Sequence, residues 1–147
     1  MADEDAQKFQ AGQSGLIVRV PEAEPLVGAW RNRLDPPARA GVPAHVTVLF
    51  PFLDASLIDE GVCAMIGDVL GRQESFEVGF ERCGRFPGVL YLTPEHLTIA
   101  QGQNEAVLQK AEADLLNGLP VVAQVSAVDL MVHDGTRWRQ QAAFRLA

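Results

Sequence analysis

The chain has 147 residues, of which 48% are hydrophobic and 21% charged, so its length and composition indicate one folded globular domain. Nineteen acidic residues against twelve basic ones leave a net charge of −7, which argues against a grip on long RNA or DNA, because that grip needs a basic surface. Every apolar run is shorter than the roughly 20 residues that span a bilayer, so no membrane partner is expected. The acidic, polar start is unlike a signal peptide, and we expect a cytoplasmic protein with a disordered lead over residues 1–13 and a single domain over 14–147.

Strands and helices alternate in the first half of the predicted structure. A β-rich run over 14–20 precedes a helix over 22–34, which shows helical spacing of its apolar residues. The prolines at its end predict a loop that extends to residue 43. A second strand follows over 44–50, and then a helix that begins after Asp54 as its N-cap residue and ends near Gly71.

The second half continues with short strands around one helix. Residues 76–80 and 89–93 alternate apolar and polar side chains, and the glycine-containing segment 84–88 between them predicts a hairpin of these two strands. The other predicted elements are a strand at 96–100, a helix at 104–117, and strands at 121–132 and 137–146. The series strand, helix, two strands occurs twice, which predicts an α+β fold of two similar lobes.

Two matching motifs of the form His-x-Thr are the most informative feature. Alternate residues of a strand share a face, so His45 projects with Thr47, and His96 projects with Thr98. Neighbouring strands would bring these four side chains to one cleft. The apolar residues between and after them are expected to face a core: Val46, Val48, Leu97 and Ile99.

Two imidazoles and two hydroxyls in one cleft suit acid–base cleavage of a phosphodiester. Imidazole titrates near neutral pH, so one ring can accept a proton while the other donates one, and a threonine hydroxyl can donate to a phosphate oxygen. Neither motif has an acidic neighbour at a spacing that suits a metal, so no metal or other cofactor is expected. The alternative is that each histidine is structural, as is common for a single histidine in a strand.

The segments AHVTVLFPF and EHLTIAQG resemble the signatures of the 2H phosphoesterase superfamily, which includes 2′-5′ RNA ligase-like proteins and cyclic phosphodiesterases. The resemblance implies two lobes of antiparallel sheet and helices around a central cleft. It also implies metal-independent action on 2′,3′-cyclic or 2′-5′ phosphodiesters of small nucleotides or RNA ends. His45 and His96 would be the acid–base pair, while Thr47 and Thr98 would hold the phosphate. The alternative function is a non-catalytic module that binds a nucleotide or phosphorylated metabolite in the same cleft.

The chain departs from this family in one respect. The family pattern implies a helix and loop of roughly 30 residues before the second motif, enough for a crossover. Here residues 92–95 run directly into His96, so either the second lobe is shortened or a stretch is missing from this sequence. A shortened lobe would expose one face of its sheet, which a second copy of the chain would be able to cover.

Several further residues are weaker candidates. Aromatic side chains can stack on a base and arginines can bind phosphate, although aromatic residues in strands are more often part of a core. Cys63 and Cys83 have no metal-ligand spacing and are expected to be packing residues. The candidates for base or phosphate contacts are Phe50, Phe86, Tyr91, Arg137 and Trp138.

Overall fold

The computed structural model describes residues 9–147, and these residues form helices and antiparallel strands, which confirms the α+β class. They divide into two compact units. The first unit comprises residues 9–18, 47–76 and 125–147, and the second unit comprises residues 19–46 and 77–124. Of the lead expected over 1–13, residues 1–8 lie outside the described residues, whereas the backbone N–H of Gly12 donates to the carbonyl of His133 at 2.9 Å. The central cleft between two lobes stays a prediction.

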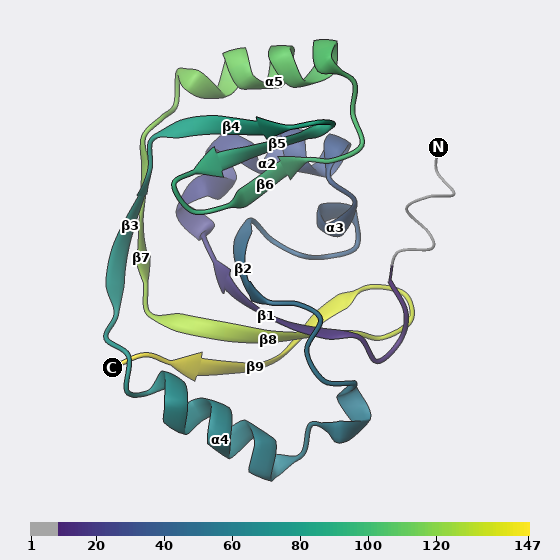
Figure 1. Ribbon diagram of the computed structural model, residues 1–147, viewed down its shortest axis with the longest axis vertical. Coiled ribbons are helices and arrows are strands. Elements are labelled where there is room, and N and C mark those ends of the chain that lie inside the picture. Colours follow the sequence, from purple (N-terminus) through teal and green to yellow (C-terminus); the bar gives the residue numbers. More distant parts are fainter. Residues whose placement is uncertain (1–8) are drawn as a thin grey trace. The chain divides into compact units, whose positions relative to one another are not determined.

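A small antiparallel sheet and the helices that pack on it form the second unit (Figure 1). The strand order is β4-β5-β6-β2. Its strands are β4 (Arg82–Phe86), β5 (Val89–Thr93), β6 (Leu97–Ala100) and the first two residues of β2 (His45–Leu49), which joins through the pair Val46 and Leu97. Its helices are the 3-10 helix η1 (Pro21–Ala23), α2 (Glu24–Leu34), α3 (Pro36–Arg39) and α5 (Glu105–Leu116).

One face of this sheet is buried beneath α2 and α5. Alternation along β5 and β6 turns Leu90, Leu92, Leu97 and Ile99 to the same side, where all four are fully buried. Val27, Leu108, Ala111 and Leu115 from the two helices complete that core. Because the apolar residues take this face, the polar side chains of the His-x-Thr motifs are left on the other.

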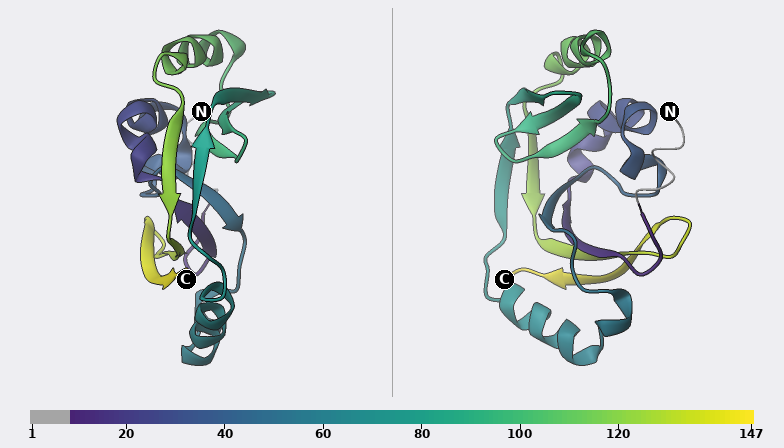
Figure 2. Two further views of the ribbon diagram at one scale, coloured as in Figure 1. Left: turned by 90° about the vertical axis from the view of Figure 1, so that its left-hand side faces the viewer. Right: turned by 45° about the vertical axis from the view of Figure 1, so that its right-hand side comes forward.

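Two further strands, β3 (Phe76–Phe80) and β7 (Val121–Val125), lie side by side as a separate pair (Figure 2). The expected hairpin of 76–80 with 89–93 is therefore wrong. The hairpin is β4 with β5, in which Phe86 pairs with Val89 across a turn at Pro87 and Gly88. Gly88 has φ of +74°, and a proline followed by such a glycine is the signature of a tight type II turn. This local turn favours the pairing of β4 with β5.

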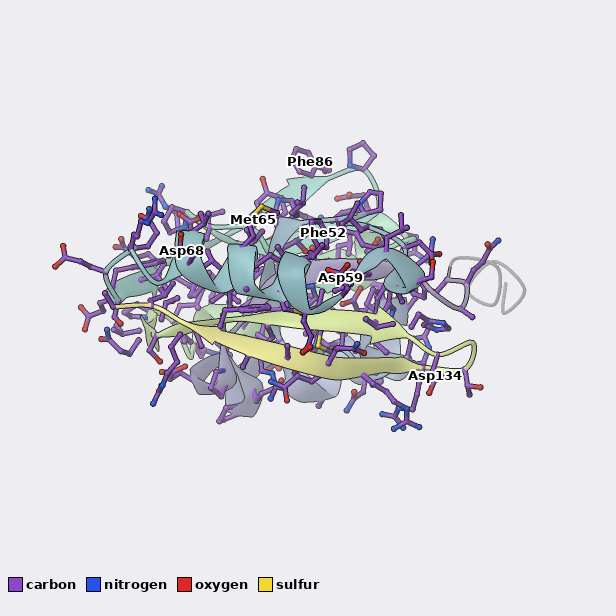
Figure 3. All side chains as sticks on the ribbon, turned by 90° about the horizontal axis from the view of Figure 1, so that it is seen from below. Phe52, Asp59, Met65, Asp68, Phe86 and Asp134 are labelled. Carbon is purple, nitrogen blue, oxygen red and sulfur yellow. The ribbon has the colours of Figure 1, made fainter. Side chains whose placement is uncertain are left out.

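The first unit contains β1 (Ser14–Arg19), β8 (Ala127–His133) and β9 (Trp138–Arg145), with the 3-10 helix η2 (Ala55–Leu57) and α4 (Glu60–Leu70). β1 is antiparallel to β8, and β8 and β9 form a hairpin whose turn begins at Asp134 (Figure 3). The predicted single strand over 121–132 is divided into β7 and β8, which are separated by Ser126.

Three local expectations also need correction. Asp54 caps the short η2 by accepting from the Ser56 N–H, while Asp59 caps α4 by accepting from the Val62 N–H at 2.9 Å. The loop expected after residue 34 contains α3, because prolines at the first positions of a helix lose no backbone hydrogen bond. Val48 is 50% exposed and does not enter a core.

Candidate functional site

The two motifs meet in the second unit because β2 and β6 are neighbouring antiparallel strands. Val46 pairs with Leu97, and both lie on the buried side of the sheet. The residues that flank this pair therefore project to the opposite, open side. On that side the antiparallel register sets His45 beside Thr98, and His96 lies two residues before Thr98, in the turn that leads into β6.

His45 is half-buried, and one ring nitrogen is already engaged. Nδ1 lies 2.8 Å from the carbonyl oxygen of Pro43, and because a carbonyl can only accept, Nδ1 carries the hydrogen. Burial of the ring lowers the pKa of His45 to about 4, the Arg31 charge lowers it further, and the Pro43 bond and Glu24 oppose the lowering. At neutral pH the ring is therefore uncharged, with its lone pair on Nε2.

His96 occupies a different environment in the turn just before β6. Its ring is exposed on one side and stacks on the ring of Tyr91, with centroids 4.0 Å apart and planes 10° from parallel. Phe86 stacks on Tyr91 at 5.0 Å and reaches His96 at 5.8 Å, so three aromatic rings gather on the open side of the sheet. Loss of hydration against these rings lowers the pKa of His96.

Tyr91 can stack on His96 because its cross-strand neighbour on β4 is a glycine. Gly84 on β4 pairs with Tyr91 on β5, and a Cβ at residue 84 would lie 2.5 Å from Cζ of that ring. Tyr91 also pairs with Thr98 across β5 and β6. The stack is thus part of the same sheet face as the second motif.

The remaining predicted site residues lie in the first unit. Thr47 follows His45 by two residues on β2 and begins the 47–76 segment of that unit. Phe50 and Trp138 pack edge to face at 5.9 Å, and Trp138 is buried, as expected for a packing aromatic. Arg137 lies in the β8–β9 turn, where its backbone N–H donates to Asp134.

An apolar hollow in the first unit offers no acid or base. It has a volume of about 240 Å³ and lies against α4, where Phe52 and Met65 form part of its wall (Figure 3). Its lining is Leu16, Phe52, Met65, Ile66, Val69 and Leu70. Within residues 9–147, no group of three or more His, Cys, Asp or Glu side chains is arranged to hold a metal ion. No helix in the same range is long and apolar enough to cross a membrane.

Sequence reasoning missed a buried ion pair behind the two motifs. Arg31 and Asp35, four residues apart at the end of α2, are both buried and form a salt bridge at 2.9 Å. A signal was available, because Arg31 occupies the same helical stripe as Val27 and Leu34, which both enter the core. A charge within an apolar stripe is unusual and indicates a buried partner.

Comparison with solved structures identifies the fold. The crystal structure of E. coli LigT complexed with 3′-AMP has a TM-score of 0.56 and 18% identity, and the match covers 92% of this chain and 99% of that one. The structure of E. coli LigT complexed with ATP has a TM-score of 0.53 and 16% sequence identity, and the match covers 95% of this chain and 99% of that one. A crystal structure described as a phosphoesterase has a TM-score of 0.50 and 14% sequence identity, and the match covers 92% of this chain and 99% of that one. The chain therefore has a LigT-like α+β fold.

A family model defines the relationship more closely. The model of the 2′-5′ RNA ligase superfamily matches residues 19–95, just over half of the chain. The matched range includes His45 and Thr47 and stops one residue before His96. Among curated proteins, none matches the chain. The chain belongs to the 2′-5′ RNA ligase superfamily.

Proposed function

We propose that the protein is a metal-independent phosphoesterase that opens 2′,3′-cyclic phosphates or cleaves 2′-5′ phosphodiesters of small nucleotides or RNA ends. The observation that carries the proposal is the register of β2 and β6, with Val46 paired to Leu97. This register brings His45, His96 and Thr98 to one open face in a chain of the 2′-5′ RNA ligase superfamily. E. coli LigT, which shares the fold, has been crystallised with the nucleotides 3′-AMP and ATP.

Two imidazoles in different protonation states suit one phosphate between them. The phosphate can accept a hydrogen bond from His96, while the Nε2 lone pair of His45 faces the attacking water on the other side. The hydroxyl of Thr98 then donates to a non-bridging oxygen. In this arrangement the protein supplies all of the acid–base chemistry.

The two histidines have different starting states, which assigns their roles. The bond from Nδ1 to Pro43 and the pKa of about 4 favour a neutral His45 with its lone pair on Nε2, which supports the role of general base. His96 is the general acid and must be protonated, although its pKa is lowered in the ligand-free protein. The negative charge of a bound phosphate raises that pKa and favours the charged ring.

For a 2′,3′-cyclic substrate the bonds and protons then balance. A water molecule gives its proton to Nε2 of His45 as its oxygen forms a bond to phosphorus. The bond from phosphorus to one ribose oxygen breaks, and His96 gives a proton to that oxygen. The product is a phosphate monoester, and the two rings exchange their protonation states before the next turnover.

The ring stack supports a nucleotide as substrate. Phe86 is 52% exposed and lies at the end of β4 (Figure 3). Its ring contacts those of Tyr91 and His96. A nucleobase can stack on its free face while the phosphate lies near the imidazoles, because aromatic rings bind bases by stacking. Phe50, Trp138 and Arg137 lie in the first unit and are not needed for this pose.

The test is incubation of the protein with nucleoside 2′,3′-cyclic phosphates and 2′-5′ dinucleotides in excess chelator. Wild-type protein should yield monoester product, and His45→Ala and His96→Ala should each lower turnover by about 10²–10⁴-fold while the protein stays folded. Thr98→Val should lower it less, by about tenfold, since it removes one hydroxyl donor. Nucleotide binding without any turnover would favour the non-catalytic module, and turnover that needs a divalent ion would contradict the mechanism.

A further inference from the structure

Arg31 lies behind the sheet and contacts the backbone of the second motif and of the segment that leads into the first. It is only 2% exposed, and its guanidinium donates from Nε to the carbonyl oxygen of Thr98 at 3.2 Å and from Nη1 to that of Val42 at 3.0 Å. Thr98 belongs to the second motif, and Val42 lies three residues before His45. One side chain thus joins the two segments that carry the proposed acid and base.

Asp35 balances this buried charge and holds the guanidinium in place. Its Oδ2 accepts from Nε and Nη2 of Arg31 at 3.2 and 2.9 Å, and its Oδ1 accepts from Nε2 of Gln101 at 2.8 Å. Burial raises the pKa of Asp35, while the Arg31 charge and these hydrogen bonds act against the rise. Gln101 follows the last residue of β6, so the network holds that strand at two points.

Glu24, at the other end of α2, contacts the same segment. Its Oε2 accepts from the backbone N–H of Ala44 at 2.7 Å. Glu24 and Arg31 are seven residues apart, which places them on one face of the helix. The helix therefore binds residues 42 and 44 on either side of Pro43, and the Pro43 carbonyl accepts the Nδ1 hydrogen of His45.

We propose that Glu24 and Arg31 are positioning residues, which hold the Pro43 carbonyl and the Thr98 backbone so that His45 presents Nε2 to the substrate. The inference rests on the proposed function for its effect on turnover, but not for its effect on the ring. A purely structural ion pair would stabilise α2 without influencing His45. The charged groups that act on the ring are Glu24 and Arg31, both from α2.

Nuclear magnetic resonance of the ¹⁵N-labelled full chain tests the proposal without substrate, because the tautomer and pKa of His45 can be read directly. The double variant Arg31→Met/Asp35→Leu replaces the ion pair by apolar groups, a change that buried pairs often tolerate. We expect its His45 to lose the single Nδ1–H tautomer and its pKa to rise toward the ordinary value. Arg33→Met, on the exposed side of the same helix, removes one charge and should leave both unchanged.

Variants of Glu24 separate charge from hydrogen bonding. Glu24→Gln can still accept from the Ala44 N–H, so the tautomer should persist while the pKa of His45 falls further. Glu24→Leu loses the bond as well, so the tautomer should become mixed. If the double variant does not fold, the tautomer of His45 in Glu24→Leu by itself tests the positioning role.

The kinetic readout links the ring to the reaction. If wild-type protein turns over a cyclic nucleotide, kcat should fall about 10- to 100-fold in Arg31→Met/Asp35→Leu, with a smaller change in KM, because a misplaced base slows the chemical step. Retention of both the Nδ1–H tautomer and the low pKa in a folded double variant would overturn the proposal, as would retention of the Nδ1–H tautomer in Glu24→Leu. If wild-type protein has no turnover but the spectra change as expected, the proposed function fails and the positioning role stands.

Discussion

The ring of Tyr91 covers the ring of His96 at 4.0 Å with only 10° between the planes. This contact removes water from one face of the imidazole, and the pKa of His96 lies below its ordinary value for that reason. His96 stands outside the regular strand, in the turn before Leu97, so the stack is the contact that orients it. The proposed acid thus depends on an aromatic side chain from the neighbouring strand.

Replacement of Tyr91 by leucine should raise the pKa of His96 toward 6.5. The leucine keeps apolar bulk but no flat ring, so water returns to the imidazole. A titration of the His96 ring signals by nuclear magnetic resonance measures the shift, and Tyr91→Phe is the control that retains the stack. Equal pKa values in the two variants would show that the stack has no influence.

Substitution of Gly84 by alanine should disturb the site without touching either histidine. The new Cβ would lie 2.5 Å from Cζ of Tyr91, so the ring must move and its contact with His96 must change. We expect a stability loss of about 1–3 kcal/mol from overpacking and altered His96 signals. Gly79→Ala on β3 is the matched control, since nothing lies within 4 Å of its Cβ. A similar effect of both variants would exclude a specific role for the Gly84–Tyr91 contact.

His45 should make the fold less stable as the pH falls. Its pKa is about 4 in the folded protein and near 6.5 when unfolded, so between these values the unfolded chain binds the extra proton. The neutral His45 ring therefore makes its full contribution to the unfolding free energy above pH 6.5. That contribution falls by at most about 3 kcal/mol as the pH drops toward 4. Urea denaturation at pH 7 and pH 4.5 measures the loss, and His45→Gln should show a smaller loss than wild type. An identical pH dependence in both proteins would contradict the lowered pKa.

Phe86 should contribute to nucleotide affinity but not to the chemical step. Phe86→Ala removes the exposed stacking surface, and stacking on one aromatic ring is worth about 1–3 kcal/mol, so KM for a cyclic nucleotide should rise roughly 5- to 150-fold. A ribose 2′,3′-cyclic phosphate that lacks a base should show no such change. Phe76→Ala, at a residue that is 50% exposed on β3, is the control. A loss of kcat with the base-free substrate would point to a role through His96 instead.

The sequence by itself determined the features that depend on neighbours in the chain. The helix α5 begins after Asn104, whose side chain accepts from the Val107 N–H as its N-cap position predicts. Two-residue alternation correctly assigned Leu97 and Ile99 to the core. The His-x-Thr motifs and the family they indicate were likewise readable, because each motif is only three residues long.

The tertiary structure decided what depends on contacts distant in sequence. Alternation predicted that residues 76–80 and 89–93 form strands, but it did not predict that the first pairs with β7 and the second with β4. The turn at Pro87 and Gly88 favours the β4–β5 pair. The sequence pattern also did not predict the surroundings of His45, because Glu24 and Arg31 come close to the Pro43 segment only when α2 packs on the sheet. Burial and long-range hydrogen bonds set the charge and tautomer of an imidazole, and neither is encoded within the motif itself.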